Sequence, residues 1–174
     1  LTSKIGKLSF RLPIISSPMD TVTEIDMASV MNMYGGLGVI HRYNTIEEQA
    51  EMCSKGGWQR AAAIGVSGTE FIDRAKALYE VGTRILCVDV AHGHHSLMKD
   101  ALIELKSTFG DEVCLIAGNV ATLQAFNDLS DWGADAIRVG IGGGSICSTR
   151  IQTGHGVPTF QSILDCSRSD RDAA

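Results

Sequence analysis

The segment Ala136-Ile137-Arg138-Val139-Gly140-Ile141-Gly142-Gly143-Gly144-Ser145-Ile146-Cys147 joins a short apolar run to a glycine-rich loop. Residues 136–139 favour a buried strand, because three of the four are apolar and two are β-branched. Four glycines then fall within residues 140–144. Glycine has no Cβ, so the backbone groups of such a loop can converge on a phosphate or a bare cation. The segment therefore predicts a strand that ends in a ligand-binding loop.

Similar apolar runs recur along the chain and alternate with helical patterns. We predict six strands, at residues 13–16, 38–41, 61–66, 85–90, 113–117 and 136–141. Their apolar residues are continuous rather than alternating, as in parallel strands that are covered on both faces. Between the first two strands, Met27, Met31 and Tyr34 recur with helical spacing and predict a core-facing stripe. A last helix is expected from about residue 158 to residue 166.

A repeated strand–helix unit fits either an open doubly wound sheet or a (β/α)₈ barrel. Polar residues follow several predicted strands, namely Ser17, Asp20, Asp89 and Asn119. The carboxyl ends of parallel strands carry the active site in both architectures. Residue placement alone therefore leaves the choice between them open.

Composition restricts the class of protein. The 174 residues suit one domain, and a net charge of −5 without a basic cluster disfavours nucleic acid or an anionic membrane as a partner. The chain has no apolar run long enough to span a membrane and no secretion signal at its first residues, which favours the cytoplasm. Its five cysteines lack C-x-x-C spacing and are predicted to be reduced thiols.

Cys147 is the candidate nucleophile. A cysteine thiolate is strongly nucleophilic, and the positive charge of Arg150 would favour ionisation of the thiol. The alternative is a buried structural cysteine, the commoner environment for this residue type. The position of Cys147 after a strand and a glycine loop favours the catalytic interpretation.

Longer motifs resemble one enzyme family. Val139-Gly140-Ile141-Gly142-x-Gly144-Ser145-Ile146-Cys147-x-Thr149-Arg150, followed by Thr153-Gly154-x-Gly156-Val157-Pro158, resembles the active-site loop of the IMP dehydrogenase / GMP reductase family. Three further similar segments appear in the expected order: Ser17-Pro18-Met19-Asp20-Thr21-Val22-Thr23-Glu24, Asp89-x-Ala91-His92-Gly93-His94 and Gly118-Asn119-Val120-Ala121-Thr122. The resemblance covers nearly the whole chain. Gly143 departs from it, because the family usually has Pro or Ser there.

The resemblance implies a (β/α)₈ TIM barrel, of which this chain supplies about six of the eight units. Residues 1–174 would then form a single catalytic barrel domain that is incomplete at its carboxyl end. Most dehydrogenases of the family insert a pair of regulatory CBS modules before the third strand predicted here. Residues 53–60 pass directly to that strand, so we expect no CBS insertion.

The resemblance also implies chemistry. Cys147 would attack C2 of a purine nucleoside monophosphate, with NAD, or NADP in a reductase, as the hydride carrier, and Thr149 would assist proton transfer. Six residues would bind the substrate, namely Ser17, Met19, Asn119, Arg138, Gly144 and Ser145. Asp89 and Gly140 would bind the dinucleotide, and the carbonyls of Gly142, Gly144 and Cys147 would hold K⁺. A homotetramer is expected.

Three functions remain after this step. NAD-dependent oxidation of IMP to XMP is favoured, because the segments around Ser17, Gly38 and Asp89 look more like the dehydrogenase. The absence of CBS modules keeps GMP reductase as the alternative. A non-catalytic purine-nucleotide-binding module is the third. Some site residues also have a structural alternative: Asp89 can cap a helix, and Asn119 can occupy a turn. His92, His94 and His95 are interpreted as solvated rather than metal-bound.

Overall fold

The computed structural model describes residues 2–55 and 59–174 and contains one curved, parallel sheet of six strands. Its strands are β3 (Ile15–Ser16), β4 (Leu37–Ile40), β5 (Ala61–Ile64), β6 (Ile85–Asp89), β7 (Cys114–Val120) and β8 (Ala136–Val139). Its helices are α1 (Ile25–Tyr34), α2 (Ile46–Ser54), α3 (Glu70–Glu80), α4 (Ser96–Phe109), α5 (Leu123–Asp131), α6 (Thr149–Thr153) and α7 (Thr159–Cys166).

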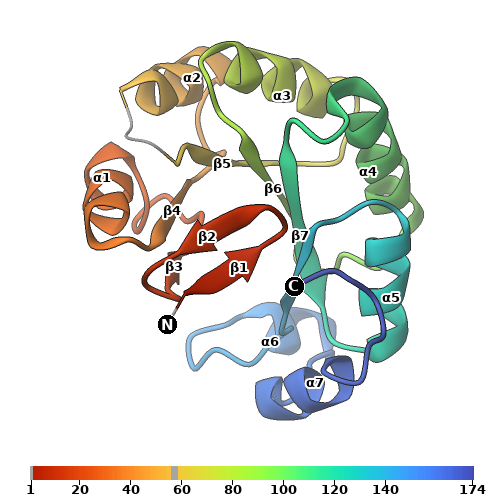
Figure 1. Ribbon diagram of the computed structural model, residues 1–174. Helices are drawn as coiled ribbons and strands as arrows, with labels where there is room; N and C mark the ends of the chain where they lie inside the picture. Colours follow the sequence, from red (N-terminus) through yellow and green to blue (C-terminus); the bar gives the residue numbers. More distant parts are fainter. Residues whose placement is uncertain (1, 56–58) are drawn as a thin grey trace.

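The strand order decides between the two candidate architectures. Strands β3 to β8 are neighbours in strict chain order and every pair is parallel. A doubly wound sheet reverses its order at a switch point, whereas a barrel does not. The helices form an arc on the outer side of the curved sheet (Figure 1). The predicted barrel, with six of its βα units in this chain, is therefore confirmed.

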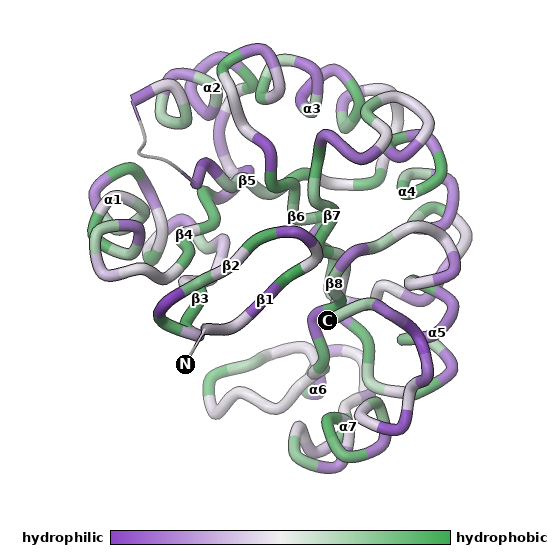
Figure 2. The backbone as a smooth tube through the Cα atoms, viewed as in Figure 1, coloured by the Kyte–Doolittle hydropathy of each residue, from purple (hydrophilic) through white to green (hydrophobic). Residues whose placement is uncertain are grey.

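Apolar residues cover both faces of the sheet, which explains the continuous apolar runs. In β5, Ala62 and Ile64 join the cluster packed against the helices, whereas Ala61 and Ala63 join the cluster inside the curve. Figure 2 shows hydrophobic residues along the central strands and many hydrophilic residues along the surrounding helices. Side chains of alternate strand residues therefore build an outer and an inner core layer.

A hairpin covers the inner layer, and sequence patterns did not predict it. Strands β1 (Ser3–Ile5) and β2 (Leu8–Phe10) pair antiparallel around Gly6, whose φ is +52°. Phe10 is buried in the inner core cluster, with Ile5 and Leu8 partly buried against it. The first predicted strand, 13–16, is reduced to Ile15–Ser16. The hairpin crosses the centre of the sheet in Figure 1.

The last residue lies along the free edge of β8. The Ala174 amide donates to the Asp135 carbonyl at 3.2 Å, and the Ile137 amide donates to the Ala174 carbonyl at 2.9 Å. These two bonds join Ala174 to the residues before and after Ala136, which is the hydrogen-bond pattern of parallel strands. Ala174 therefore occupies the place of a further strand next to β8.

The predicted core stripe of α1 is wrong. Met27 and Tyr34 are exposed, and Ala28 is the buried residue of this helix. Helix α2, by contrast, begins as its sequence indicates, with Thr45 and Glu48 forming a complete capping box. Residues 56–58, at the expected junction without CBS modules, lie outside the described residues. Within the described residues, no helix has the length and apolar composition needed to cross a bilayer.

A buried polar network fixes the turn between β4 and α2. The Gln49 side chain is fully buried, and its Nε2 donates to the carbonyls of His41 and Ala63, both at 2.9 Å. Its Oε1 accepts from Arg74 Nη1 at 2.9 Å, and Arg74 Nη2 donates to Glu70 at 2.7 Å. These bonds tie α2 and α3 to the carboxyl ends of β4 and β5.

Candidate active site

The glycine-rich loop leaves β8 at the end of the sheet where parallel strands present their carboxyl termini. The Gly140 amide donates to the Val120 carbonyl at 2.7 Å, so the start of the loop stays attached to β7. This amide is therefore already used by the fold. Gly140 and Gly142 have φ values of +136° and +76°, which L side chains adopt only with strain. The expected concentration of glycines thus has a conformational cause at these two positions.

Cys147 lies half-buried at the end of this loop, immediately before α6. Hydrogen bonds from the side chain and then the backbone of Thr149 lower the pKa of the Cys147 thiol, and the positive charge of Arg150 acts in the same direction. The Cys147 amide donates to the Gly144 carbonyl at 3.1 Å, which closes the turn. Thr149 therefore forms a hydrogen bond with the candidate nucleophile.

The other four cysteines have the opposite electrostatic environment. Burial raises the pKa of Cys53 and of Cys87 to about 11 and that of Cys114 to about 12, and it also raises the pKa of Cys166. Loss of hydration disfavours a thiolate, whereas hydrogen-bond donors and a nearby cation favour it. Cys147 is thus the one cysteine of the five whose surroundings promote ionisation.

Two of the three carbonyls expected to hold K⁺ already accept hydrogen bonds. Arg150 Nη1 donates to the Gly142 carbonyl at 2.9 Å, and the Gly144 carbonyl accepts the Cys147 amide. A carbonyl oxygen has two lone pairs, so the bond to Gly144 leaves room for a cation. At Gly142, however, the guanidinium already places a positive charge on the oxygen. In this arrangement a free cation does not fit the complete set of three carbonyls.

Asp89 and Arg138 are brought together at the carboxyl ends of β6 and β8. Arg138 Nη1 donates to the Asp89 carboxylate and also contacts Cys87 Sγ at 3.6 Å. Both charged side chains are partly buried. The residues expected to bind dinucleotide and nucleotide therefore form one ion pair in this structure.

Asn119 lies inside β7, not after it, because this strand runs to Val120 and the prediction ended it at residue 117. The Gly93 amide donates to the Asn119 carbonyl at 2.7 Å, and the Gly118–Asn119 peptide bond is cis. Asn119 Oδ1 is buried and has no hydrogen-bond partner among the described residues. A buried acceptor without a donor is costly, so this atom is suited to a donor from a ligand.

Ser17 and Met19 lie after β3, at the opposite edge of the sheet from β8. The Ser17 carbonyl accepts the Thr23 hydroxyl at 2.6 Å and the Met19 amide at 2.9 Å, and both side chains are exposed. Within the described part of the chain, no hydrogen bond joins this turn to the Cys147 loop. Ser145, expected to bind phosphate, is likewise exposed.

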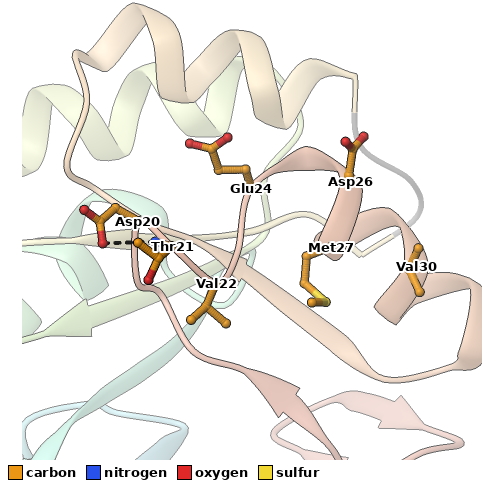
Figure 3. Close-up of a pocket in the computed structure, with 7 residues that line it drawn as sticks. All are labelled: Asp20, Thr21, Val22, Glu24, Asp26, Met27 and Val30. Carbon is orange, nitrogen blue, oxygen red and sulfur yellow. Dashed lines mark hydrogen bonds between the residues drawn. The ribbon is translucent and has the colours of Figure 1, made fainter. Parts of the chain in front are cut away.

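An open hollow of about 480 Å³ lies next to this turn. Figure 3 shows its seven lining residues, Asp20, Thr21, Val22, Glu24, Asp26, Met27 and Val30. They come from α1 and the turn before it, and one of them, Glu24, bonds the buried His41 at 3.0 Å. The hollow does not include Cys147, so it is separate from the candidate nucleophile.

Thr159 is a neighbour of the loop that sequence motifs did not indicate. A Cβ on Gly143 would lie 1.9 Å from Thr159 Oγ1, so the hydroxyl occupies the space a side chain would need. The departure of Gly143 from the family pattern thus has a local steric cause. Two of the three histidines interpreted as solvated have structural partners instead: His94 bonds Asp128 at 2.8 Å, and His95 caps α4, whereas His92 is exposed.

A parallel barrel with an activated cysteine at the carboxyl end of a strand is the arrangement of a barrel-enzyme site. The profile of the family described as IMP dehydrogenase / GMP reductase domain matches residues 1–174. The chain belongs to this family.

Individual relatives agree with the family assignment. The chain is 36% identical to inosine-5'-monophosphate dehydrogenase of Cryptosporidium parvum, over 96% of this chain and 52% of that protein. It is 36% identical to a GMP reductase of Leishmania major, over 93% of this chain and 31% of that protein. The crystal structure of inosine 5' monophosphate dehydrogenase from Legionella pneumophila superposes with a TM-score of 0.92 at 45% identity, over 98% of this chain and 53% of that one. The chain thus spans about half, or less, of their length.

Proposed function

We propose that the protein oxidises IMP to XMP, with Cys147 as the covalent nucleophile. The observation that supports this most directly is that the surroundings of Cys147 lower its pKa, whereas those of the other four cysteines raise theirs. A thiolate is the reactive form of cysteine, and the strand-end loop is where barrel enzymes carry their chemistry.

In the proposed reaction the thiolate of Cys147 bonds to C2 of the purine, and this carbon becomes tetrahedral as a ring nitrogen gains a proton. The hydride on C2 then leaves with its electron pair; NAD⁺, when held by Asp89 and Gly140, would be its acceptor. Water adds to C2 of the resulting thioimidate, and the C–S bond breaks to give XMP and the free thiolate. Thr149, bonded to the sulfur, stabilises the thiolate at the start and at the end.

The remaining site residues bind and orient. We propose that the unpartnered Asn119 Oδ1 accepts a hydrogen bond from the nucleotide and that Arg138, Ser17, Met19, Gly144 and Ser145 complete the substrate site. Asp89 and Gly140 are proposed to lie along the dinucleotide, with the Asp89 carboxylate held in place by Arg138. The whole protein is proposed to act in the cytoplasm as a homotetramer with a K⁺ requirement.

GMP reductase is the second candidate, favoured by the similarity to the Leishmania major enzyme. The same thiolate adduct would then lose ammonia, and hydride would return from NADPH to give IMP. Incubation with IMP plus NAD⁺, and separately with GMP plus NADPH, distinguishes the two by absorbance of the reduced nicotinamide. Appearance of NADH with IMP supports the dehydrogenase, and loss of NADPH with GMP supports the reductase.

Two cysteine variants test the nucleophile. Cys147→Ser should abolish turnover and labelling by a 6-chloropurine ribotide, read by mass, whereas Cys114→Ser should retain both. Labelling without turnover in either assay would favour the nucleotide-binding module. A folded protein that is neither labelled nor active would contradict the proposal.

A further inference from the structure

The side chain of Arg150 is held against the glycine loop by backbone on two sides. Its Cβ lies 3.5 Å from the place where a Cβ on Gly142 would stand and 3.4 Å from the corresponding place on Gly156. The Val157 amide donates to the Ile141 carbonyl at 3.1 Å, so the segment after α6 is hydrogen-bonded to the glycine-rich loop next to Arg150. The Cβ of the exposed Arg150 therefore lies between two glycines.

The charge of Arg150 has no carboxylate to neutralise it. Within residues 2–55 and 59–174, no acidic side chain lies within ion-pair distance of its guanidinium. The guanidinium donates instead to the Gly142 carbonyl at 2.9 Å. An arginine usually directs its planar fork at a carboxylate or phosphate. Here the guanidinium donates instead to the Gly142 carbonyl, which is one of the three carbonyls expected to hold K⁺.

We propose that Arg150 is a tethered cation that closes the carbonyl cradle of Gly142, Gly144 and Cys147, so that K⁺ must displace its guanidinium to bind. A second positive charge on the Gly142 oxygen would be repelled by the guanidinium that already donates to it. Occupation of the Gly142 carbonyl by Arg150 and coordination of K⁺ there therefore compete. This inference rests on the proposed function only in naming K⁺ as the competing ion.

The test measures K⁺ binding through thermal stability rather than turnover. The melting temperature of the chain is followed while KCl replaces NaCl at constant ionic strength, because an ion that binds only the folded state stabilises it in proportion to its occupancy. Arg150→Gln removes the tethered charge and should lower the K⁺ midpoint by at least about tenfold. Arg168→Gln, an exposed arginine on the surface of the last turn, should leave the midpoint unchanged.

A second variant covers the case in which Arg150→Gln does not fold. Arg150→Lys keeps the charge on a shorter, non-planar group, so its midpoint should lie between those of the wild type and the glutamine variant. Equal K⁺ midpoints in the wild type and the Arg150 variants, or no K⁺-specific effect in any of them, would overturn the inference. A shifted midpoint in a protein that fails the IMP and GMP assays would retain the competition and reject the proposed function.

Discussion

The guanidinium of Arg138 reaches the carboxylate of Asp89 across the whole width of strand β7. Asp89 is in register with Gly118 on one side, and Gly118 is in register with Arg138 on the other. A Cβ on Gly118 would lie only 2.7 Å from Arg138 Cβ and 3.0 Å from the Arg138 carbonyl oxygen. Because Gly118 has no side chain, Arg138 can pass over β7 and pair with Asp89.

Gly118→Ala should therefore destabilise the fold by about 1–3 kcal/mol, because the methyl group forces Arg138 and its backbone to move. Urea denaturation measures the loss. Gly65→Ala is the matched control, since its new Cβ would meet only the Arg42 side chain at ordinary contact distance, 3.5 Å. The control should change stability by less than about 0.5 kcal/mol. Equal effects of the two substitutions would contradict the steric explanation.

Thr149→Val should slow alkylation of Cys147 by iodoacetamide roughly three- to tenfold at neutral pH. The substitution removes the hydroxyl that bonds the sulfur, so the pKa of the thiol rises and less thiolate is present. The measurement is the rate of mass gain at Cys147 as a function of pH. Ser148→Ala, at the exposed neighbouring position, should leave the profile unchanged. A profile for Thr149→Val identical to that of the wild type would remove Thr149 from the proposed chemistry.

Stability should fall as pH rises from about 9 to about 11. Burial raises the pKa of Cys87 from an ordinary value of 9.0 to about 11, and that of Cys53 by a similar amount. Between these pH values the unfolded chain has released these protons and the folded chain has kept them, so unfolding becomes progressively easier. Urea midpoints across this range measure the slope. Cys87→Ala should flatten it, and a slope as steep as that of the wild type would show that other groups cause the decline.

Gln49→Leu should destabilise the protein by about 2–4 kcal/mol. Leucine leaves the carbonyls of His41 and Ala63 and a donor of Arg74 without their partner in a fully buried place. Gln161→Leu is the control, because the exposed Gln161 bonds only the side chain of Asp165. Chemical denaturation compares the two. A loss below about 1 kcal/mol for Gln49→Leu would mean that water replaces the lost hydrogen bonds.

The sheet could be predicted from sequence because its strands are apolar on both faces. A run such as Ala61 to Ile64 has no polar residue, as expected for a strand that is covered on two sides. The hairpin at the start of the chain could not be predicted in the same way. Its strands have three residues each, and the burial of Phe10 comes from the inner face of the sheet, which lies far away in sequence.

The inward face of α1 shows where hydrophobicity misleads. Met27 is more apolar than Ala28, yet Ala28 faces the sheet. A Cβ on Gly38 would lie 2.5 Å from the Ala28 Cα, so the helix approaches the strand too closely for a larger side chain. This distance depends on the packing of two elements, and no pattern within α1 contains it.

The candidate site was predictable where residue type determines the chemistry. Cys147, Thr149 and the glycine loop were identified from their motif, and the structure adds the thiol environment that the motif does not state. The contacts that sequence could not predict are those between side chain and backbone across loops. Two examples are the hydrogen bond from Arg150 to the Gly142 carbonyl and the close approach of the Thr159 hydroxyl to Gly143. Both depend on how the loop folds back.

The β1–β2 hairpin lies against the amino-terminal ends of β7 and β8, where Gly6 meets Cys114 and Asp135, whereas Cys147 follows the carboxyl end of β8. The hairpin and the proposed nucleophile thus lie at opposite ends of the strands. A dye or a surface linker attached at the exposed Lys4 of β1 would sit at the hairpin end of the sheet. The end that carries Cys147 would stay open to solution.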